Sequence, residues 1–104
     1  MAENIDQIKS ILKQYIKIIK QHKIEIEKIY LFGSYARGTA TDESDIDIAI
    51  ISNDFEGDRF LDRRKIVPLR RNIDRRIEPI PFRTEDFTKS DPLALEIMTN
   101  GIEI

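Results

Sequence analysis

The chain has 104 residues, of which 40% are hydrophobic and 35% charged, with a formal net charge of −2, no cysteine and one histidine. This length builds one core, so we expect one globular domain over residues 1–104. The composition excludes disulfides, thiolate metal sites and histidine metal clusters, and the charge argues against direct nucleic-acid binding. No apolar run approaches the roughly 18 residues that span a bilayer and the first residues lack a signal-peptide pattern, so we expect a cytoplasmic protein without membrane contact.

The first half of the chain predicts one helix and two strands. Apolar residues recur at helical spacing over residues 5–19, Asn4 and Gln7 form a capping-box pattern at the start, and His22 ends the helix. Residues 26–32 predict a strand that ends at Gly33-Ser34, and residues 45–51 predict a second strand rich in β-branched side chains. The segment between these strands is short and polar.

The second half predicts further helices and a third strand. Residues 53–57 form a turn, in which we expect Phe55 to pack, and residues 58–72 follow a helical pattern that Pro68 splits or bends. Residues 75–82 predict a third strand, which Pro79 and Pro81 either place at a sheet edge or limit to a ladder over its first residues. A last helix begins at residues 90–92 and ends at Gly101. No internal repeat or linker interrupts these elements.

Two aspartates at the start of the second strand are candidate metal ligands. Side chains alternate along a strand, so Asp45 and Asp47 share one face, which we expect to be open, while the isoleucines between and after them pack on the other. Their Cα atoms lie roughly 6.5 to 7 Å apart, which suits two cations about 3.5 to 4 Å apart. Oxygen ligands favour Mg²⁺, with Mn²⁺ as a substitute. Alternatively, Asp45 is only a turn residue and Asp47 only faces water.

The Gly-Ser turn before these aspartates is a candidate phosphate-binding site. Gly33 has no Cβ to obstruct a phosphate, and a short helix that begins at Ser34 directs backbone N–H groups and a hydroxyl outward. Arg37 follows one turn later and can add a charge-assisted contact. A turn that binds triphosphate next to a strand that binds its metal ions is chemically coherent. We expect Tyr35 to flank the nucleotide.

A third carboxylate is expected, because activating an acceptor hydroxyl requires a base or a metal-bound oxygen nearby. Glu78 is the candidate, since an adjacent strand can bring it to the face of Asp45 and Asp47. In the alternative interpretation it is an exposed strand residue. Asp42, Glu43 and Asp74 are rival acids that we expect on loop and helix-end surfaces.

The pattern of Gly33-Ser34, ten residues and then Asp45-x-Asp47 resembles the signature of the DNA polymerase β nucleotidyltransferase superfamily. The length and residues 29–32 resemble its minimal MNT-type members, which are often antitoxins of HEPN toxins. The resemblance implies an α/β (α+β) fold in which helices back a small mixed sheet. It also implies that Asp45, Asp47 and Glu78 are catalytic metal ligands, although Asp is common in the family where Glu78 stands here. Gly33 and Ser34 would bind the triphosphate of an NTP, most often ATP.

The implied reaction is in-line attack of an acceptor hydroxyl on the α-phosphorus, with pyrophosphate leaving. Larger relatives carry an added acceptor-binding domain for which this chain has no residues left. The resemblance therefore implies a tyrosine hydroxyl of a HEPN toxin as the acceptor, and an antitoxin that acts by transferring AMP.

The alternative function is a binding module that neutralises its partner by contact alone. The basic stretch between residues 59 and 76 can dock an acidic partner or help to hold triphosphate, or it is only a solvated helix face. Its members are Arg59, Arg63, Arg64, Lys65, Arg70, Arg71, Arg75 and Arg76. RNA binding is a weaker third possibility, because the stretch lacks interleaved aromatic residues.

Overall fold

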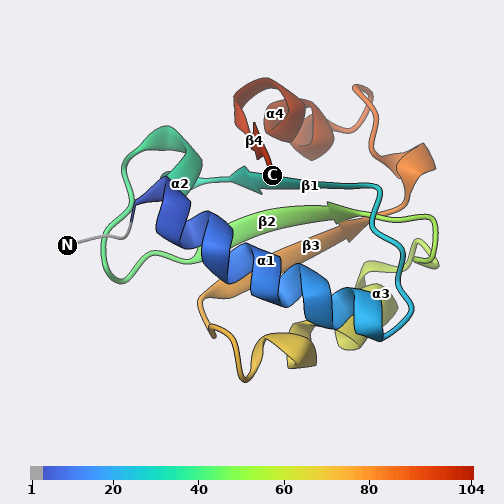
Figure 1. Ribbon diagram of the computed structural model, residues 1–104. Helices are drawn as coiled ribbons and strands as arrows, with labels where there is room; N and C mark the ends of the chain where they lie inside the picture. The colour runs from blue at the N-terminus through green and yellow to red at the C-terminus, as the bar shows by residue number, and fades with distance from the viewer. Residues whose placement is uncertain (1–3) are drawn as a thin grey trace.

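The described part of the chain, residues 4–104 of a computed structural model, folds into a four-stranded sheet with helices on both faces (Figure 1). The elements in chain order are α1 (Ile5–Gln21), β1 (Lys28–Phe32), α2 (Ser34–Arg37), β2 (Ile46–Ile51), α3 (Arg59–Ile66), the 3-10 helix η1 (Val67–Arg70), β3 (Ile77–Phe82), the 3-10 helix η2 (Thr84–Asp86), α4 (Pro92–Asn100) and β4 (Ile102–Glu103). The strand order is β3-β2-β1-β4. Because β1 is antiparallel to β2 and β4 while β2 is parallel to β3, the sheet is mixed, which confirms the expected fold class.

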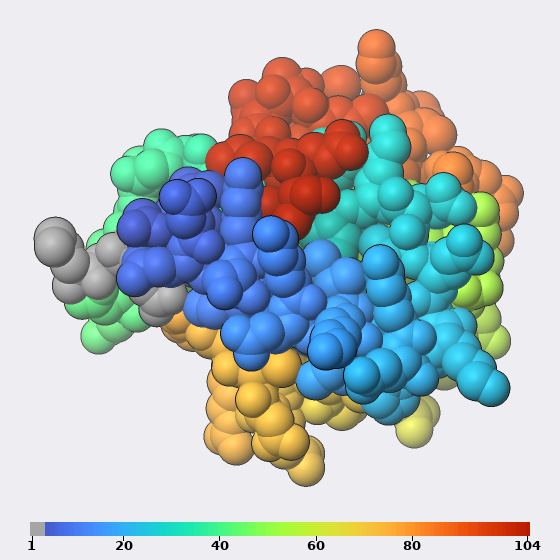
Figure 2. Space-filling view, in the orientation of Figure 1, coloured from blue at the N-terminus to red at the C-terminus, as the bar shows by residue number. Residues whose placement is uncertain are grey.

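Helix α1 begins and ends as the sequence predicts. The side chain of Asn4 accepts a hydrogen bond from the backbone N–H of Gln7, and the Gln7 side chain accepts one from the backbone N–H of Asn4. The apolar stripe of α1 is buried against the sheet, with Ile8, Leu12 and Tyr15 fully covered. His22 ends the helix, and its Nδ1 lies 3.0 Å from the Ile18 carbonyl oxygen. In the space-filling view this helix, in blue, lies across the face of the molecule turned to the viewer (Figure 2).

The second strand is buried on both faces, which corrects the expectation of an open acidic face. Ile46, Ile48 and Ile50 pack on the α1 side, where Phe55 is also buried as expected. Ala49 and Ile51 point to the other face, the face of Asp47, and belong to the small core that includes Ala94 and Ile97 of α4. A strand buried on both faces needs a continuous apolar run, and residues 48–51 provide one. Only the first residues of the strand therefore present an open acidic face.

Strand β3 is an edge strand, as its prolines predict, and two arginines bind its carbonyl groups. Arg63 Nη1 donates a hydrogen bond of 3.0 Å to the Pro79 carbonyl, and Arg70 Nη1 donates one of 2.6 Å to the Ile77 carbonyl. These arginines come from the helical segment that Pro68 divides, as predicted, into α3 and η1. The edge of the sheet next to the acidic residues is therefore covered by guanidinium groups.

Two short elements were not predicted, and the three predicted strands begin later than expected. β1, β2 and β3 begin at Lys28, Ile46 and Ile77. β4 has two residues and pairs with β1 through Leu31 and Ile102, and the 3-10 helix η2 has three residues. Such short segments are too brief to carry a periodic hydrophobic pattern. Among the helices of residues 4–104, none has the length and hydropathy that a membrane crossing requires.

Candidate functional site

The sheet brings three acidic residues together at the start of β2. Asp47 is the second residue of β2, and Asp45 is the residue just before the strand begins, so the two aspartates lie two residues apart along the chain. In the parallel pairing of β2 and β3, Asp47 is directly opposite Glu78. Side chains at paired positions point to the same face, about 4.8 Å apart at the backbone. The structure therefore gathers the three carboxylates that the sequence predicts as ligands.

The electrostatics of Asp47 reflect this crowding. Burial raises the pKa of the Asp47 carboxyl group above its usual value, and the carboxylates of Asp45 and Glu78 raise it further. The Arg37 guanidinium lowers the pKa of Asp47, so its positive charge lies close enough to affect this carboxylate. A raised pKa means that the negative charge of Asp47 is disfavoured where it stands. The start of β2 is therefore a position at which an added cation would be stabilising.

Gly33 lies directly against Asp47. Phe32, the last residue of β1, pairs with Asp47, so the turn that follows it passes next to this carboxylate. The backbone of Gly33 has φ 71° and ψ −150°, a region that is essentially restricted to glycine. A Cβ atom on this residue would also collide with the Asp47 carboxylate. Gly33 is therefore required by its own conformation and by the neighbouring acid.

The short helix α2 begins at Ser34, as predicted. The first N–H groups of a helix have no carbonyl partner within it, so they are directed outward from the turn. Arg37 is the last residue of α2, and its backbone N–H donates to the Gly33 carbonyl over 3.1 Å. The structure thus brings Gly33, Ser34 and Arg37 to the side of Asp47, in an arrangement that could receive an anionic group.

Tyr35 does not occupy the position we expected. The sequence suggested that it flanks a nucleotide, but only 4% of its surface is exposed and its ring lies in the core. Its hydroxyl accepts a hydrogen bond of 3.1 Å from Arg76, whose guanidinium also binds both carboxylate oxygens of Asp74, at 3.1 and 2.8 Å. Tyr35 therefore anchors α2 to the loop before β3. Tyr35 and Arg76 are 41 residues apart, and no local pattern indicates the contact.

The contacts with Arg76 also exclude Asp74 as a rival candidate for the third carboxylate. Hydrogen bonds from Arg76 hold the pKa of Asp74 below its usual value, so this carboxylate is ionised and already paired. Asp42 and Glu43 are exposed in the loop before β2, as expected.

Glu78 has two arginine partners that sequence reasoning did not connect to it. Arg70 Nη1 lies 2.9 Å from Glu78 Oε1, and Arg63 Nη2 lies 3.5 Å from Glu78 Oε2. The Glu78 side chain is partly buried, so it is not a freely solvated strand residue. The basic stretch of the sequence was a signal for such pairing, but the pairing depends on how α3 and η1 pack along β3.

The donor set fits a magnesium–nucleotide complex better than an isolated metal ion. Among residues 4–104, no three His, Cys, Asp or Glu side chains are arranged to hold a metal by themselves. Mg²⁺, however, is usually bound by one or two carboxylates together with substrate phosphates and waters. Asp45 and Asp47 next to the Gly33 turn provide two such carboxylates and a place for phosphates. Glu78 can join them only by giving up contacts with its arginines.

Comparisons with known proteins agree with this interpretation of the fold. Residues 6–104 match the family model described as Polymerase beta, Nucleotidyltransferase. A provisionally named protein adenylyltransferase of Methanocaldococcus jannaschii is 50% identical over 48 residues, which cover 46% of this chain and 47% of that protein. Protein adenylyltransferase MntA of Shewanella oneidensis is 46% identical over 39 residues, which cover 38% of this chain and 28% of that protein. The match spans about half the length of the first of these relatives.

A solved structure shows the same fold. It is the crystal structure of a protein from Sulfolobus solfataricus that is provisionally described as a nucleotidyltransferase. The match covers 90% of this chain and 76% of that chain with a TM-score of 0.65. At 21% identity it supports the fold alone.

Proposed function

Because the chain belongs to the polymerase β nucleotidyltransferase family, we propose that it transfers the AMP of ATP onto a hydroxyl group of another protein. The observation that carries this proposal is the position of Asp47, directly opposite Glu78 and against the turn at Gly33, with Asp45 close enough to raise its pKa. The names of the relatives, which are protein adenylyltransferases, support AMP as the group and protein as the acceptor.

In the proposed reaction, a bond forms between the acceptor oxygen and the α-phosphorus of ATP, and the bond from that phosphorus to pyrophosphate breaks. The N–H groups at the start of α2, the Ser34 hydroxyl and the Arg37 guanidinium hold the triphosphate. Asp45 and Asp47 would hold two divalent cations, for which we propose Mg²⁺ with Mn²⁺ as a substitute. Such ions, when bound, supply positive charge to the attacking and leaving oxygens. Glu78 is proposed as the third carboxylate, which accepts the hydroxyl proton or completes the metal site.

We further propose that the acceptor is a tyrosine of a HEPN-type toxin and that the transfer neutralises it. The test combines this chain, ATP labelled on its α-phosphate and Mg²⁺ with such a partner encoded by a neighbouring gene. The expected result is a partner adduct of AMP mass, which the variant Asp45→Asn with Asp47→Asn does not form. A partner that remains unmodified in the presence of the wild-type chain contradicts the proposal.

The same variant separates catalysis from neutralisation by contact. The asparagines keep the size of both side chains but remove the charges that hold cations. If the doubly substituted chain neutralises the partner as well as the wild type does, contact is sufficient and the transfer is not the basis of neutralisation. If neutralisation disappears while the two proteins still bind, the transfer is required.

A further inference from the structure

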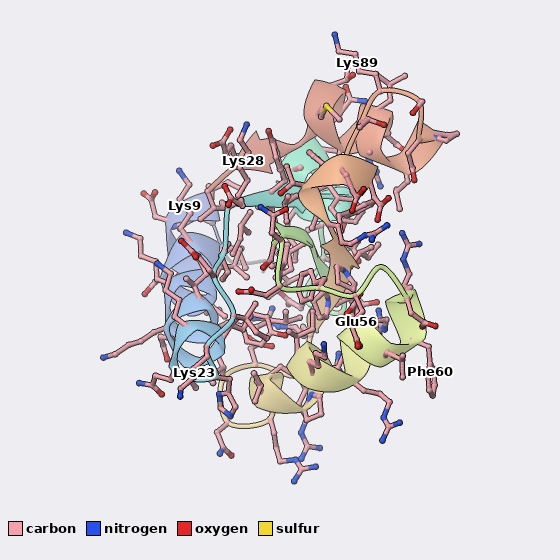
Figure 3. The ribbon with its side chains drawn as sticks, turned by 90° about the vertical axis from the view of Figure 1, so that its right-hand side faces the viewer. Lys9, Lys23, Lys28, Glu56, Phe60 and Lys89 are labelled. Carbon is pink, nitrogen blue, oxygen red and sulfur yellow. The ribbon has the colours of Figure 1, made fainter. Side chains whose placement is uncertain are left out.

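Helix α3 and the following η1 present apolar side chains to solvent. Within residues 4–104, Phe60 is 70% exposed and Leu61, next to it in α3, is 40% exposed. Figure 3 shows Phe60 extending outward on the opposite side of the molecule from α1. A shallow hollow of about 280 Å³ lies between Phe60, Arg63, Arg64, Val67 and Pro68. An exposed aromatic side chain at the rim of an apolar hollow is typical of protein-binding surfaces.

This part of the chain also concentrates positive charge. Residues 58–76 contain eight Lys or Arg and three Asp, a net charge of +5, in a chain whose net charge is −2. Two of these aspartates are used internally. Asp62 is 2% exposed and accepts hydrogen bonds from the backbone N–H groups of Glu56 and Gly57, and Asp74 is paired with Arg76. Asp62 and Asp74 therefore compensate Lys65 and Arg76, and the remaining arginines of the stretch have to be considered one by one.

Several of the cations on this surface have no carboxylate partner. Arg71 and Arg75 line a second hollow together with Val67, Pro68 and Arg70. Within the part of the chain that the structure describes, Arg71 and Arg75 make no ion pair, and Arg64 is placed over the Phe60 ring at 5.8 Å instead of next to an acid. We call Phe60, Arg64, Val67, Pro68, Arg71 and Arg75 the α3–η1 surface. It combines an apolar hollow with uncompensated positive charge.

The α3–η1 surface adjoins the carboxylate cluster through Arg63. This arginine borders the hollow next to Phe60, and its Nη2 atom lies 3.5 Å from Glu78 Oε2. Phe60 and Arg63 are three residues apart in α3, so their side chains lie next to each other on the helix. A protein segment bound here would reach the edge of the site at which the transfer is proposed.

We propose that the α3–η1 surface docks the acceptor protein through a segment that combines acidic side chains with one large apolar side chain. The proposal rests on the proposed function, because it takes the acceptor to be a protein. The apolar side chain fills the hollow next to Phe60, and the acidic side chains pair with Arg64, Arg71 and Arg75. Single-stranded nucleic acid fits less well, because Phe60 is the one aromatic residue of this surface and successive bases need successive stacking partners.

The test uses short fluorescent peptides that contain one tyrosine and differ in two features. Their flanking residues are either Glu or Lys, and one neighbouring position is either Leu or Ser. We expect the wild-type chain to bind the Glu-Leu peptide most tightly. Phe60→Ser should weaken binding of the Leu peptides by about tenfold and leave the Ser peptides unchanged. Arg71→Glu with Arg75→Glu should reverse the preference from Glu to Lys peptides, a gain that requires a folded chain.

A matched control changes the same net charge elsewhere. Lys13 and Lys17 are exposed on α1, so Lys13→Glu with Lys17→Glu should leave the peptide preference as it is in the wild type. Each of three results would overturn the proposal. The first is an unchanged peptide preference in the Arg71 and Arg75 variant, and the second is equal binding of Glu and Lys peptides by the wild type. The third is tighter binding of an oligothymidine than of the Glu-Leu peptide.

AMP transfer to the same peptides, measured in parallel, separates this inference from the proposed function. Selective binding of the Glu-Leu peptide without transfer of AMP supports the docking surface and contradicts the proposed transfer of AMP to a protein hydroxyl. Transfer of AMP to all peptides at the same rate, with the same binding affinity for each, supports the proposed transfer and contradicts the docking surface.

Discussion

Replacing Gly33 with alanine should damage both the fold and the site, and Gly38→Ala provides a matched control. Both glycines flank α2 and both have positive φ, 71° for Gly33 and 76° for Gly38. A Cβ on Gly33 would meet the Asp47 carboxylate, whereas one on Gly38 would have open space around it. Both variants therefore place a Cβ at a residue with positive φ, but only the Cβ at Gly33 collides with a neighbouring side chain.

The expected cost for Gly33→Ala has two parts. Alanine at φ 71° and ψ −150° is strained by about 1 to 3 kcal/mol. The crowding against Asp47 adds about 1 to 3 kcal/mol, the usual range for an overpacked position. Gly38 has left-handed helical geometry, with φ 76° and ψ 18°, where alanine costs about 1 to 2 kcal/mol. Gly33→Ala should therefore lower the free energy of unfolding by about 2 to 6 kcal/mol, against about 1 to 2 kcal/mol for the control.

Urea unfolding measures these costs, and titration with ATP and Mg²⁺ measures the site. We expect Gly38→Ala to keep nucleotide binding and Gly33→Ala to lose it. A double-mutant cycle with Asp47→Ala isolates the collision, because the carboxylate that the new methyl group meets is then absent. A coupling free energy of about 1 to 3 kcal/mol is expected. A coupling near zero, or equal destabilisation by the two glycine variants, would refute the proposed contact between Gly33 and Asp47.

Three further predictions concern single side chains. Without metal, Asp47→Asn should raise the thermal midpoint of unfolding at neutral pH, because the raised pKa of Asp47 means that its negative charge opposes folding. The gain should vanish in acid, where the Asp47 carboxyl group is protonated in both the folded and the unfolded state. A lower midpoint of the variant at pH 7 would contradict this prediction. Asp74→Asn should lower the free energy of unfolding by about 1 to 2 kcal/mol at pH 7, because it loses contacts with Arg76. This stabilisation of the wild type is present above the usual pKa of an aspartate and disappears as the pH falls through the lowered pKa of Asp74. A pH-independent difference between the two chains in urea unfolding argues against the prediction. Tyr15→Phe should cost about 1 kcal/mol in the same assay, because the buried Tyr15 hydroxyl donates to the Ile66 carbonyl over 2.6 Å, and an unchanged stability would show that this hydrogen bond contributes little.

The features that the sequence predicted correctly depend on near neighbours in the chain. The capping box of Asn4 and Gln7, the helix start at Ser34, the division of a helix at Pro68 and the helix start before Pro92 each follow from a few adjacent residues. The interpretation of Asp45 and Asp47 as metal ligands is equally local, because it depends on side-chain alternation along one short segment, and it stays a prediction. Such signals keep their meaning wherever the segment lies in the fold.

The features that the sequence left undetermined depend on packing between distant segments. The parallel register that places Glu78 opposite Asp47 joins residues 31 positions apart. The burial of Tyr35 and its hydrogen bond with Arg76 reversed our interpretation of an aromatic residue that lies next to a predicted binding turn. The cover that α4 forms over Ala49 likewise required the whole sheet to be known. Residue type alone could not decide these cases, because a tyrosine suits both a core and a binding site.

The distribution of positive charge around the three carboxylates explains why they behave differently. Glu78 lies between Arg63 and Arg70, so its negative charge is already compensated. Within residues 4–104, Asp47 makes no ion pair with an arginine; burial and two neighbouring acids raise its pKa, and Arg37 lowers it. A cation that arrives with a nucleotide therefore gains most at Asp45 and Asp47, while binding to Glu78 requires it to displace a guanidinium group. Since Arg63 also borders the α3–η1 surface, the proposed docking surface and the carboxylate cluster share one arginine, while Arg70 remains the nearer partner of Glu78.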